Sequence, residues 1–294
     1  MTHSINRLLA VMLFLLVTTQ TVQAAQVKQF RIQSEQLKNT LSNYTILDVR
    51  EPSIYRKGHI EGALNLPASW TFQHKKVNGK IITPNRIQVI LRNLGIEKNT
   101  PVVVYDDGNL VDSARVFWTL EVYDLNDVKI LNAGYDSWSK QKFPTSTQTT
   151  KPATSHYIPS VNHNRLATKF TTQIASKNPN KIIIDARDAS AYQGLKSSAE
   201  RFGHIPSAIN LPASHNFQSI NETFSLQPIE KLKTLYNHIP KNKKVVVYCA
   251  LGRVSATNYF VLRELGFDVS NYDSSWKEWG NDRQLPITQP HKNK

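Results

Sequence analysis

The chain has 294 residues, of which 40% are hydrophobic and 20% are charged. This composition excludes a disordered chain and leaves room for two domains with cores of their own. The formal net charge of +14 would suit a nucleic-acid partner. However, the basic residues are scattered, and their densest groups, at 74–76 and 241–244, are not interleaved with the aromatic residues that base stacking requires. We therefore expect no nucleic-acid partner, and a basic surface that attracts anions.

The first 24 residues have the pattern of a signal peptide. Arg7 supplies a positive charge, the apolar run 8–17 is too short to span a bilayer comfortably, and Val22-Gln23-Ala24 offers a cleavage site after Ala24. An uncleaved N-terminal anchor is the alternative. We expect an exported protein, periplasmic or secreted, that has no stable membrane association once the leader is removed.

The residues after the leader predict short strands that alternate with helices. Leu47-Asp48-Val49-Arg50 closes a strand, and Glu51-Pro52 starts a turn and a helical segment through Tyr55. The segment 58–67 leads into a second strand, and the apolar run 101–105 forms a third. Such alternation is typical of an α/β fold with a parallel sheet that helices cover on both faces.

The second half of the chain repeats these motifs in the same order. The matched segments are 48–50 with 185–187, 58–67 with 203–212, 101–105 with 244–248, 113–114 with 255–256, and 134–138 with 271–276. Asp48 and His59 are 11 positions apart, whereas Asp185 and His204 are 19 apart, so the second copy carries eight extra residues, within 193–201. The repeat has the length of a domain. We expect one domain over 27–145, a linker rich in Thr, Ser and Pro over 146–160, and a second domain over 161–290.

Cys249 is the only cysteine of the chain, and it stands at the carboxyl end of the apolar strand 244–248. A tight loop follows, and then a helix that begins near Val254 or Ser255 and stops at Gly266. Ligands bind at this edge of a parallel sheet, and a loop that returns to a helix N-terminus aims several N–H groups at one point. A thiol held there should ionise easily.

The alternative for this cysteine is an inert residue that packs as a small hydrophobe. Gly252 and Arg253 favour a reactive thiol, because they make its surroundings permissive and electropositive. Export favours it too. Exported proteins commonly pair their cysteines as disulfides, and a single cysteine has no partner within the chain.

The first copy carries Asp106 where the second carries Cys249. Asp106 and Asp107 could in principle bind a metal, but two adjacent carboxylates without a third ligand are more often turn or capping residues. The first domain therefore lacks the nucleophile, and the sequence implies no metal or organic cofactor.

These motifs together resemble the tandem-domain rhodaneses, the thiosulfate and 3-mercaptopyruvate sulfurtransferases. The resemblance covers about residues 27–290 and rests on Asp-x-Arg, Gly-His-Ile-x-x-Ala-x-Asn-Leu-Pro, the Cys-x-x-Gly loop and the segment 272–279. In that family the first domain usually lacks the cysteine and the second domain carries catalysis. This agrees with Asp106 in the first copy and Cys249 at the same position in the second. The resemblance implies that Cys249 takes a sulfur from a small anionic donor as a persulfide and passes it to cyanide or a thiol.

The resemblance also suggests which residues bind the donor and the persulfide. The expected set comprises the loop residues Ala250, Leu251, Gly252, Arg253, Val254 and Ser255, together with Arg201. Loop amides would stabilise the persulfide, Arg253 would hold an anionic donor or face solvent, and the Ser255 hydroxyl would donate a hydrogen bond or cap the helix. Two positions depart from the family, because Val254 and Ala191 stand where many members have arginine.

Other residues of the shared motifs are expected to be structural. Arg50 and Arg187 should pair with nearby carboxylates, and His59 and His204 should be turn residues, since they recur in the domain without a nucleophile.

Two further functions remain as alternatives. A cysteine phosphatase or arsenate reductase needs a longer loop with arginine six residues after the cysteine, where this chain has Ser255. A non-catalytic sulfur carrier or partner-binding module of an exported pathway is the other alternative, which the missing arginine at Ala191 keeps open.

Overall fold

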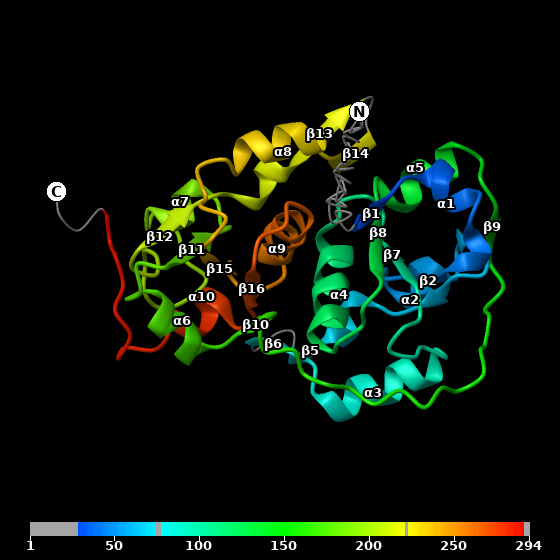
Figure 1. The fold of residues 1–294 in the computed structure, drawn as a ribbon, viewed down its shortest axis with the longest axis horizontal. Coiled ribbons are helices and arrows are strands. Elements are labelled where there is room, and N and C mark those ends of the chain that lie inside the picture. Colours follow the sequence, from blue (N-terminus) through cyan, green and yellow to red (C-terminus); the bar gives the residue numbers. More distant parts are fainter. Residues whose placement is uncertain (1–28, 75–77, 221–222, 291–294) are drawn as a thin grey trace, which may run out of the picture.

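The computed structural model describes residues 29–74, 78–220 and 223–290, which form two similar α/β domains (Figure 1). The signal peptide predicted for residues 1–24 lies outside the described residues. Each domain is built on a five-stranded parallel sheet. The expected fold, two tandem domains with helices flanking parallel sheets, is confirmed.

The sheet of the first domain has the strand order β1-β8-β7-β2-β4. In chain order, the elements of this domain are β1 (Arg31–Ile32), α1 (Ser34–Lys38), the 3-10 helix η1 (Leu41–Asn43), β2 (Thr45–Asp48), α2 (Pro52–Tyr55), β3 (His59–Ile60), β4 (Leu64–Asn65), the 3-10 helix η2 (Ala68–Thr71), β5 (Phe72–His74), β6 (Asn78–Ile81), α3 (Pro84–Asn93), β7 (Val102–Tyr105), α4 (Val111–Val122), β8 (Val128–Leu131), α5 (Gly134–Lys140) and β9 (Thr145–Ser146).

The sheet of the second domain has the equivalent order β10-β16-β15-β11-β12. In chain order, the elements of this domain are β10 (Leu166–Ala167), α6 (Lys169–Ala175), β11 (Lys181–Asp185), α7 (Ala189–Tyr192), β12 (Ala208–Asn210), the 3-10 helix η3 (Ala213–Asn216), β13 (Phe217–Ile220), β14 (Thr223–Leu226), α8 (Ile229–Leu235), β15 (Lys244–Tyr248), α9 (Ser255–Glu264), β16 (Val269–Tyr272) and α10 (Ser275–Trp279). Each domain also carries an antiparallel hairpin, β5–β6 in the first and β13–β14 in the second.

The central strands are short runs of β-branched residues, and all four residues of β7 are buried. Such continuous apolar runs suit strands that are covered on both faces. The two sheets share one register at their carboxyl edge, where Asp48 pairs with Tyr105 and Asp185 pairs with Tyr248. Each tyrosine hydroxyl donates to its paired aspartate, at 2.7 Å in the first domain and 2.6 Å in the second.

The structure corrects the sequence match between the last motifs of the two halves. The sequence pattern aligns Trp138 with Trp276, but Trp138 occupies the position of Trp279. Both indoles donate to a proline carbonyl that lies a few residues onward, at 2.9 Å and 2.8 Å. The residue of the first domain that is equivalent to Trp276 is Tyr135. Trp276 donates its backbone N–H to the Cys249 carbonyl, and Tyr135 donates its backbone N–H to the Asp106 carbonyl, each at the residue that follows the central strand of its sheet.

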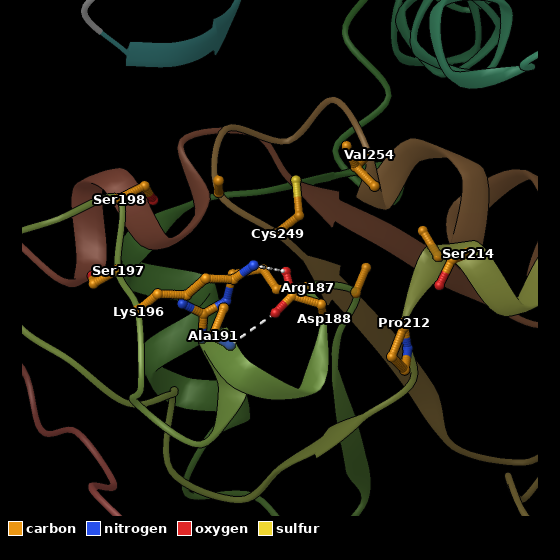
Figure 2. A pocket seen from close by; sticks show the side chains of 13 residues that line it. Arg187, Asp188, Ala191, Lys196, Ser197, Ser198, Pro212, Ser214, Cys249 and Val254 are labelled. Carbon is orange, nitrogen blue, oxygen red and sulfur yellow. Dashed lines mark hydrogen bonds and ion pairs between the residues drawn. The ribbon is translucent and has the colours of Figure 1, made fainter.

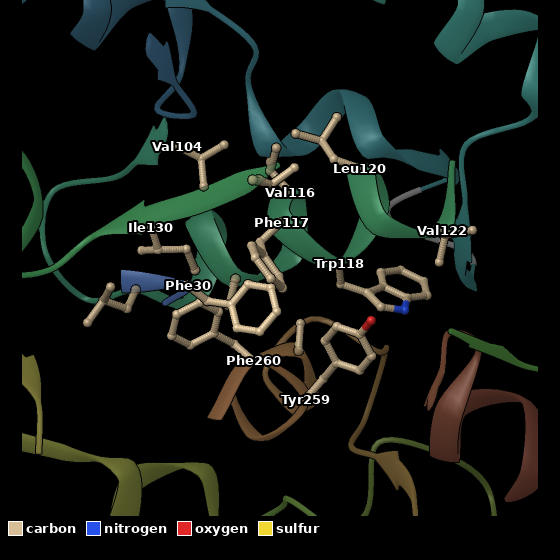
Figure 3. Packing of buried hydrophobic residues seen from close by; sticks show 14 of the residues in the cluster. Phe30, Val104, Val116, Phe117, Trp118, Leu120, Val122, Ile130, Tyr259 and Phe260 are labelled. Atoms are coloured by element: carbon tan, nitrogen blue, oxygen red, sulfur yellow. The ribbon is translucent and has the colours of Figure 1, made fainter. Parts of the chain in front are cut away.

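The two domains pack against each other through α4 and α9, which lie side by side at the centre of the molecule (Figure 1). Figure 3 shows the aromatic contacts of this interface. The ring of Phe117 on α4 meets Phe260 on α9 edge to face at 5.0 Å, and it meets Phe30 in the same way at 5.5 Å. Residues 113–122 of α4 are all buried, so this helix serves as part of the core of both domains.

The segment that joins the domains follows the surface of the first domain as an extended chain (Figure 1). Ser155 donates its N–H to the Arg92 carbonyl at 3.0 Å, and the Arg92 side chain donates to the Tyr157 carbonyl at 2.8 Å. Tyr157 is buried, and its hydroxyl donates to the Tyr123 carbonyl. Nowhere in the described ranges is there a helix with the length and apolar character to cross a membrane.

Candidate active site

Cys249 follows β15 directly, at the carboxyl edge of the second sheet. Its N–H donates to the Ser275 hydroxyl at 3.1 Å, and its carbonyl accepts from Trp276 N–H at 3.0 Å. Ser275 has a φ of 53°, a left-handed conformation that costs a non-glycine residue about 1 kcal/mol or more. The backbone of Cys249 is thus fixed from both sides, and its free thiol is 2% exposed.

A cavity of about 450 Å³ opens beside Cys249 (Figure 2). Its walls come from the strand ends, α7, the segment after α7, the start of η3 and the cysteine loop. The lining residues are Ala186, Arg187, Asp188, Ala191, Lys196, Ser197, Ser198, Pro212, Ala213, Ser214, Cys249, Ala250 and Val254. The cavity is large enough for a small organic or inorganic anion.

One wall of this cavity is formed by the extra residues that distinguish the second copy from the first. Lys196, Ser197 and Ser198 lie within the insertion, and the Lys196 ammonium pairs with the Asp188 carboxylate at 2.9 Å (Figure 2). Both side chains are more than half exposed. The sequence indicates the insertion but not its role, so these three residues are absent from the expected site. The position of the insertion directly before the motif 203–212 is the sequence signal that could have indicated its place at the site.

The cysteine loop turns sharply at Gly252, which has a φ of 67°. A Cβ atom there would lie 2.3 Å from the Asp273 carbonyl oxygen, so only glycine fits. The Gly252 carbonyl accepts from the Asn271 amide at 3.0 Å and from the Arg115 guanidinium at 3.1 Å. By contrast, the N–H groups of residues 250–254 donate no hydrogen bond to any atom in the described part of the chain. They are therefore available to an anion.

The matching loop of the first domain holds a carboxyl group of its own. The Asp106 carboxylate accepts hydrogen bonds from the N–H groups of Gly108, Leu110 and Ser113 at 2.9, 3.1 and 3.1 Å, and from the Ser113 hydroxyl at 3.0 Å. Burial raises the pKa of Asp106, and these hydrogen bonds oppose the rise. The interpretation of Asp106 as a turn and capping residue is confirmed. No group of three or more His, Cys, Asp or Glu residues that could hold a metal occurs in the ranges the structure describes.

Three of the expected binding residues point elsewhere. Arg253 forms a two-pronged ion pair with Asp112 of the first domain, with nitrogen–oxygen distances of 2.6 and 2.8 Å. The Arg201 guanidinium donates to four backbone carbonyls, those of Trp279, Gly280, Asp282 and Leu285. The Ser255 hydroxyl donates to the Asn271 side chain at 2.7 Å. None of the three lines the cavity. Their side chains hold the domain interface, the C-terminal segment and the loop instead.

Other expected loop residues do reach the cavity or shape it. Ala250 and Val254 line it, and Ala191 does too, so both positions where this chain departs from the family face the same space. Leu251 and Gly252 do not line the cavity. Gly252 shapes the turn instead.

Arg187 forms the structural pair expected for it but differs from its counterpart in one respect. It donates to Asp185 at 2.6–3.1 Å, as Arg50 donates to Asp48. The Nη1 atom of Arg50 also pairs with Asp107 at 3.3 Å, whereas the buried Nη1 of Arg187 has no partner among the described residues. Arg187 lines the cavity. The Asp-x-Arg motif is shared by both domains and gives no sign of this difference, whereas Ala250 in place of Asp107 is a signal that the sequence does carry.

The two motif histidines have the structural role expected of them. Each ring stacks on a tyrosine at 3.8 Å, His59 on Tyr55 and His204 on Tyr192. In each case Nδ1 lies 2.8 Å from the carbonyl of that tyrosine.

Comparison with known proteins agrees with this geometry. The family model described as Rhodanese-like domain matches twice, at residues 33–141 and 167–282. A Mycobacterium leprae protein assigned by name as a thiosulfate sulfurtransferase is 32% identical over 260 residues, covering 84% of this chain and 92% of its own length. The sulfur carrier protein TtuD of Thermus thermophilus is 30% identical over 259 residues, covering 82% of this chain and 90% of its own.

Among solved structures, SseA from Escherichia coli, described as a 3-mercaptopyruvate enzyme with the rhodanese fold, superposes with a TM-score of 0.75. The match covers 85% of this chain and 100% of SseA at 23% identity, so it supports the fold. With two matches to the family model and relatives that align along most of their length, the chain belongs to the rhodanese family, as a two-domain sulfurtransferase.

Proposed function

We propose that this protein moves a sulfane sulfur from a small anionic donor, thiosulfate or 3-mercaptopyruvate, to a thiophilic acceptor through a persulfide on Cys249. The observation that carries the proposal is the contrast between the two loops. In the first domain the Asp106 carboxylate accepts hydrogen bonds from N–H groups of its loop. In the second domain the N–H groups of residues 250–254 donate no hydrogen bond to any described atom. A negatively charged persulfide on Cys249 is the anion that this loop would stabilise.

The first half-reaction transfers one sulfur atom to the enzyme. The Cys249 thiolate attacks the outer sulfur of thiosulfate, a new sulfur–sulfur bond forms, and the old one breaks with its electron pair leaving on sulfite. With 3-mercaptopyruvate the carbon–sulfur bond breaks instead. The carbon then takes the thiol proton, so that pyruvate leaves. Both routes give the same persulfide anion.

The second half-reaction returns the enzyme to its thiolate. Cyanide or a small thiol attacks the outer sulfur of the persulfide, and the electron pair of the broken bond returns to the Cys249 sulfur. With cyanide the product is thiocyanate. No other redox partner is needed, because the sulfur atom carries the change in oxidation state.

Two cationic side chains are suited to hold the donor in the cavity. Arg187 has an unpartnered buried Nη1 atom within the described residues, and Lys196 stands at the cavity wall in an exposed pair with Asp188. Guanidinium and ammonium groups both bind oxyanions, the first with directed hydrogen bonds and the second as a point charge. We propose that they replace the family arginine that is absent at Ala191.

The test is a steady-state assay of thiocyanate formation from cyanide with each donor in turn. We expect saturable turnover with at least one donor and none in Cys249→Ser. Lys233→Met, a change at an exposed lysine of α8 that does not line the cavity, is the control and should retain turnover. If the wild-type protein is folded and its thiol is free but it turns over neither donor, the catalytic proposal fails. The sulfur-carrier function would then lead.

We also propose that the protein is exported, because residues 1–24 combine a positive start, a short apolar run and a cleavage motif. The mass of the protein recovered from the expressing cells tests this proposal. We expect a mature chain that begins at Ala25 outside the cytoplasm, and an intact chain that stays in the cytoplasm would contradict the proposal.

A further inference from the structure

A side chain of the cysteine-free domain reaches the cysteine loop. Arg115 lies on α4 of the first domain and is fully buried. Its Nη1 donates to the Gly252 carbonyl of the second domain at 3.1 Å, and its Nη2 donates to the Gly79 carbonyl at 3.2 Å. A single guanidinium thus joins the first domain to the turn of the loop that carries Cys249.

A buried carboxylate accompanies this guanidinium. Asp273, 8% exposed, accepts from Ile81 N–H of the first domain at 2.9 Å and from its neighbour Ser274 at 2.7 Å. Burial lowers the pKa of Arg115 to about 10, and Asp273, Cys249 and Tyr123 oppose this fall while Arg253 adds to it. Arg115 therefore stays charged near neutral pH, with Asp273 as its main counter-charge.

The internal repeat offers a comparison within one molecule. Two residues after the matched serines Ser113 and Ser255, the first domain has Arg115 and the second has Thr257. The contact of Ile81 with Asp273 is likewise mirrored by Leu226, which donates to Asn132 at 3.3 Å. A buried cation and a buried carboxyl group thus occur together at the loop with the cysteine. The equivalent positions at the loop with Asp106 are neutral.

Other contacts press the first domain against the cysteine loop at the same place. A Cβ atom on Gly79 would lie 2.0 Å from the Leu251 carbonyl oxygen and 2.4 Å from that of Asp273. Asp112, one turn before Arg115 on α4, holds Arg253. The first domain therefore fixes both the backbone and the flanking charge of this loop.

We infer that Arg115 is a positioning residue for sulfur transfer, which holds the Cys249 loop through Gly252 and offsets the charge of Asp273, whose backbone carbonyl lies against Gly252 of the same loop. The inference rests on the proposed function for its purpose. The cysteine-free domain would then be part of the active-site machinery, because it supplies this buried cation across the interface.

An electrostatic role of Arg115 and a purely structural role predict different effects of substitutions at Arg115 and Asp273. Removal of the Arg115 charge leaves Asp273 uncompensated beside the Cys249 loop, which disfavours the thiolate. Removal of the Asp273 charge has the opposite effect. A purely structural role predicts that both substitutions disturb the loop without opposite signs.

The experiment follows the rate of Cys249 alkylation by iodoacetamide against pH in the full chain. We expect Arg115→Gln to move the midpoint to higher pH and to slow alkylation near neutral pH by about tenfold, the effect of a one-unit shift. Asp273→Asn should move the midpoint to lower pH, the double variant should lie close to the wild type, and Arg115→Lys should recover most of the rate. Arg187, Asp188 and Lys196, which also line the cavity, are unchanged throughout.

Arg263→Gln is the matched control. Arg263 pairs with Glu121 across the same interface at 2.9 Å, at the far end of α9 from the cysteine loop. It should lower the unfolding temperature and leave the midpoint unchanged. Equal shifts of one sign in Arg115→Gln and Asp273→Asn, or no shift in either, would overturn the inference. If Arg115→Gln does not fold, the direction of the Asp273→Asn shift decides alone. Alkylation needs no sulfur donor, so its result is separate from failure of the proposed function.

Discussion

Asp106 and Cys249 occupy equivalent positions after the central strands of the two sheets, and their loops differ accordingly. The Asp106 carboxylate accepts from three backbone N–H groups of its loop. The loop after Cys249 makes no equivalent contacts among the described residues. One domain thus carries a carboxyl group where the other carries the Cys249 thiol.

This relationship predicts the behaviour of Cys249→Asp. The new carboxylate should accept the loop N–H groups as Asp106 does, and hydrogen bonds to a charged acceptor contribute about 1.5–3 kcal/mol each before the cost of burial. We expect a folded protein without sulfur transfer, whose unfolding temperature is at least that of Cys249→Asn. Circular dichroism melts measure it. An aspartate variant several degrees below the asparagine variant would contradict the shared arrangement.

Ala250→Asp tests the free guanidinium nitrogen of Arg187. In the first domain Asp107 takes the equivalent Nη1 of Arg50, and Ala250 stands at the position of Asp107. The new carboxylate should pair with Arg187 and repel an anionic donor, so KM for thiosulfate should rise at least several-fold. Ala250→Asn keeps the shape without the charge. Equal KM values for the two variants would exclude Arg187 from donor binding.

Lys196→Met tests the cation on the cavity wall. Its pair with Asp188 is exposed, so the free energy of unfolding should change by no more than about 0.5 kcal/mol. KM for thiosulfate should rise, kcat should stay near the wild-type value, and the difference should shrink as salt is added. Lys233→Met, which removes an exposed lysine paired with Glu230 on α8, is the control and should leave KM unchanged. An unaltered KM in Lys196→Met would assign that side chain to the surface alone.

His204 predicts a pH dependence of stability. Burial lowers the pKa of His204 below its ordinary 6.5, although the Tyr192 carbonyl opposes the shift. Between the two values the unfolded chain binds more protons than the folded one, so the free energy of unfolding should fall as pH drops through 6.5. Urea titrations at several pH values should show a smaller fall for His204→Gln. Parallel curves for variant and wild type would contradict the prediction.

The sequence predicts the two sheets and the place of Cys249 at the end of a strand because these depend on local patterns. Apolar strands such as 244–248 are bounded by clear turns, and Cys249 follows one of them directly. The start of α9 at Ser255 and its end before Gly266 also follow from local signals. The register of the C-terminal motifs does not, because Trp276 and Trp279 are both tryptophans of a short helix and only the pairing of strands decides which one matches Trp138.

The roles of the arginines depend on residues far away in the chain. Arg253 pairs with Asp112, which lies 141 positions earlier in the chain. Arg201 donates to backbone carbonyls that lie 78–84 positions later. A motif shows the type of side chain and its distance from Cys249 but not these partners. Arg187 looks purely structural in the sequence, yet the structure makes it a candidate for donor binding. In the first domain Asp107 pairs with the equivalent Arg50, whereas Ala250 at that position in the second domain leaves Nη1 of Arg187 without a partner among the described residues.

The proposed mechanism requires sulfur to rest covalently on Cys249 between donor and acceptor. Intact mass spectrometry before and after treatment with thiosulfate or 3-mercaptopyruvate tests it directly, with Cys249→Ser treated in parallel. We expect a gain of one sulfur atom in the wild type alone, which cyanide removes as thiocyanate appears. A wild-type protein that forms thiocyanate without ever carrying the added sulfur, or a serine variant that gains it equally, would contradict a persulfide on Cys249.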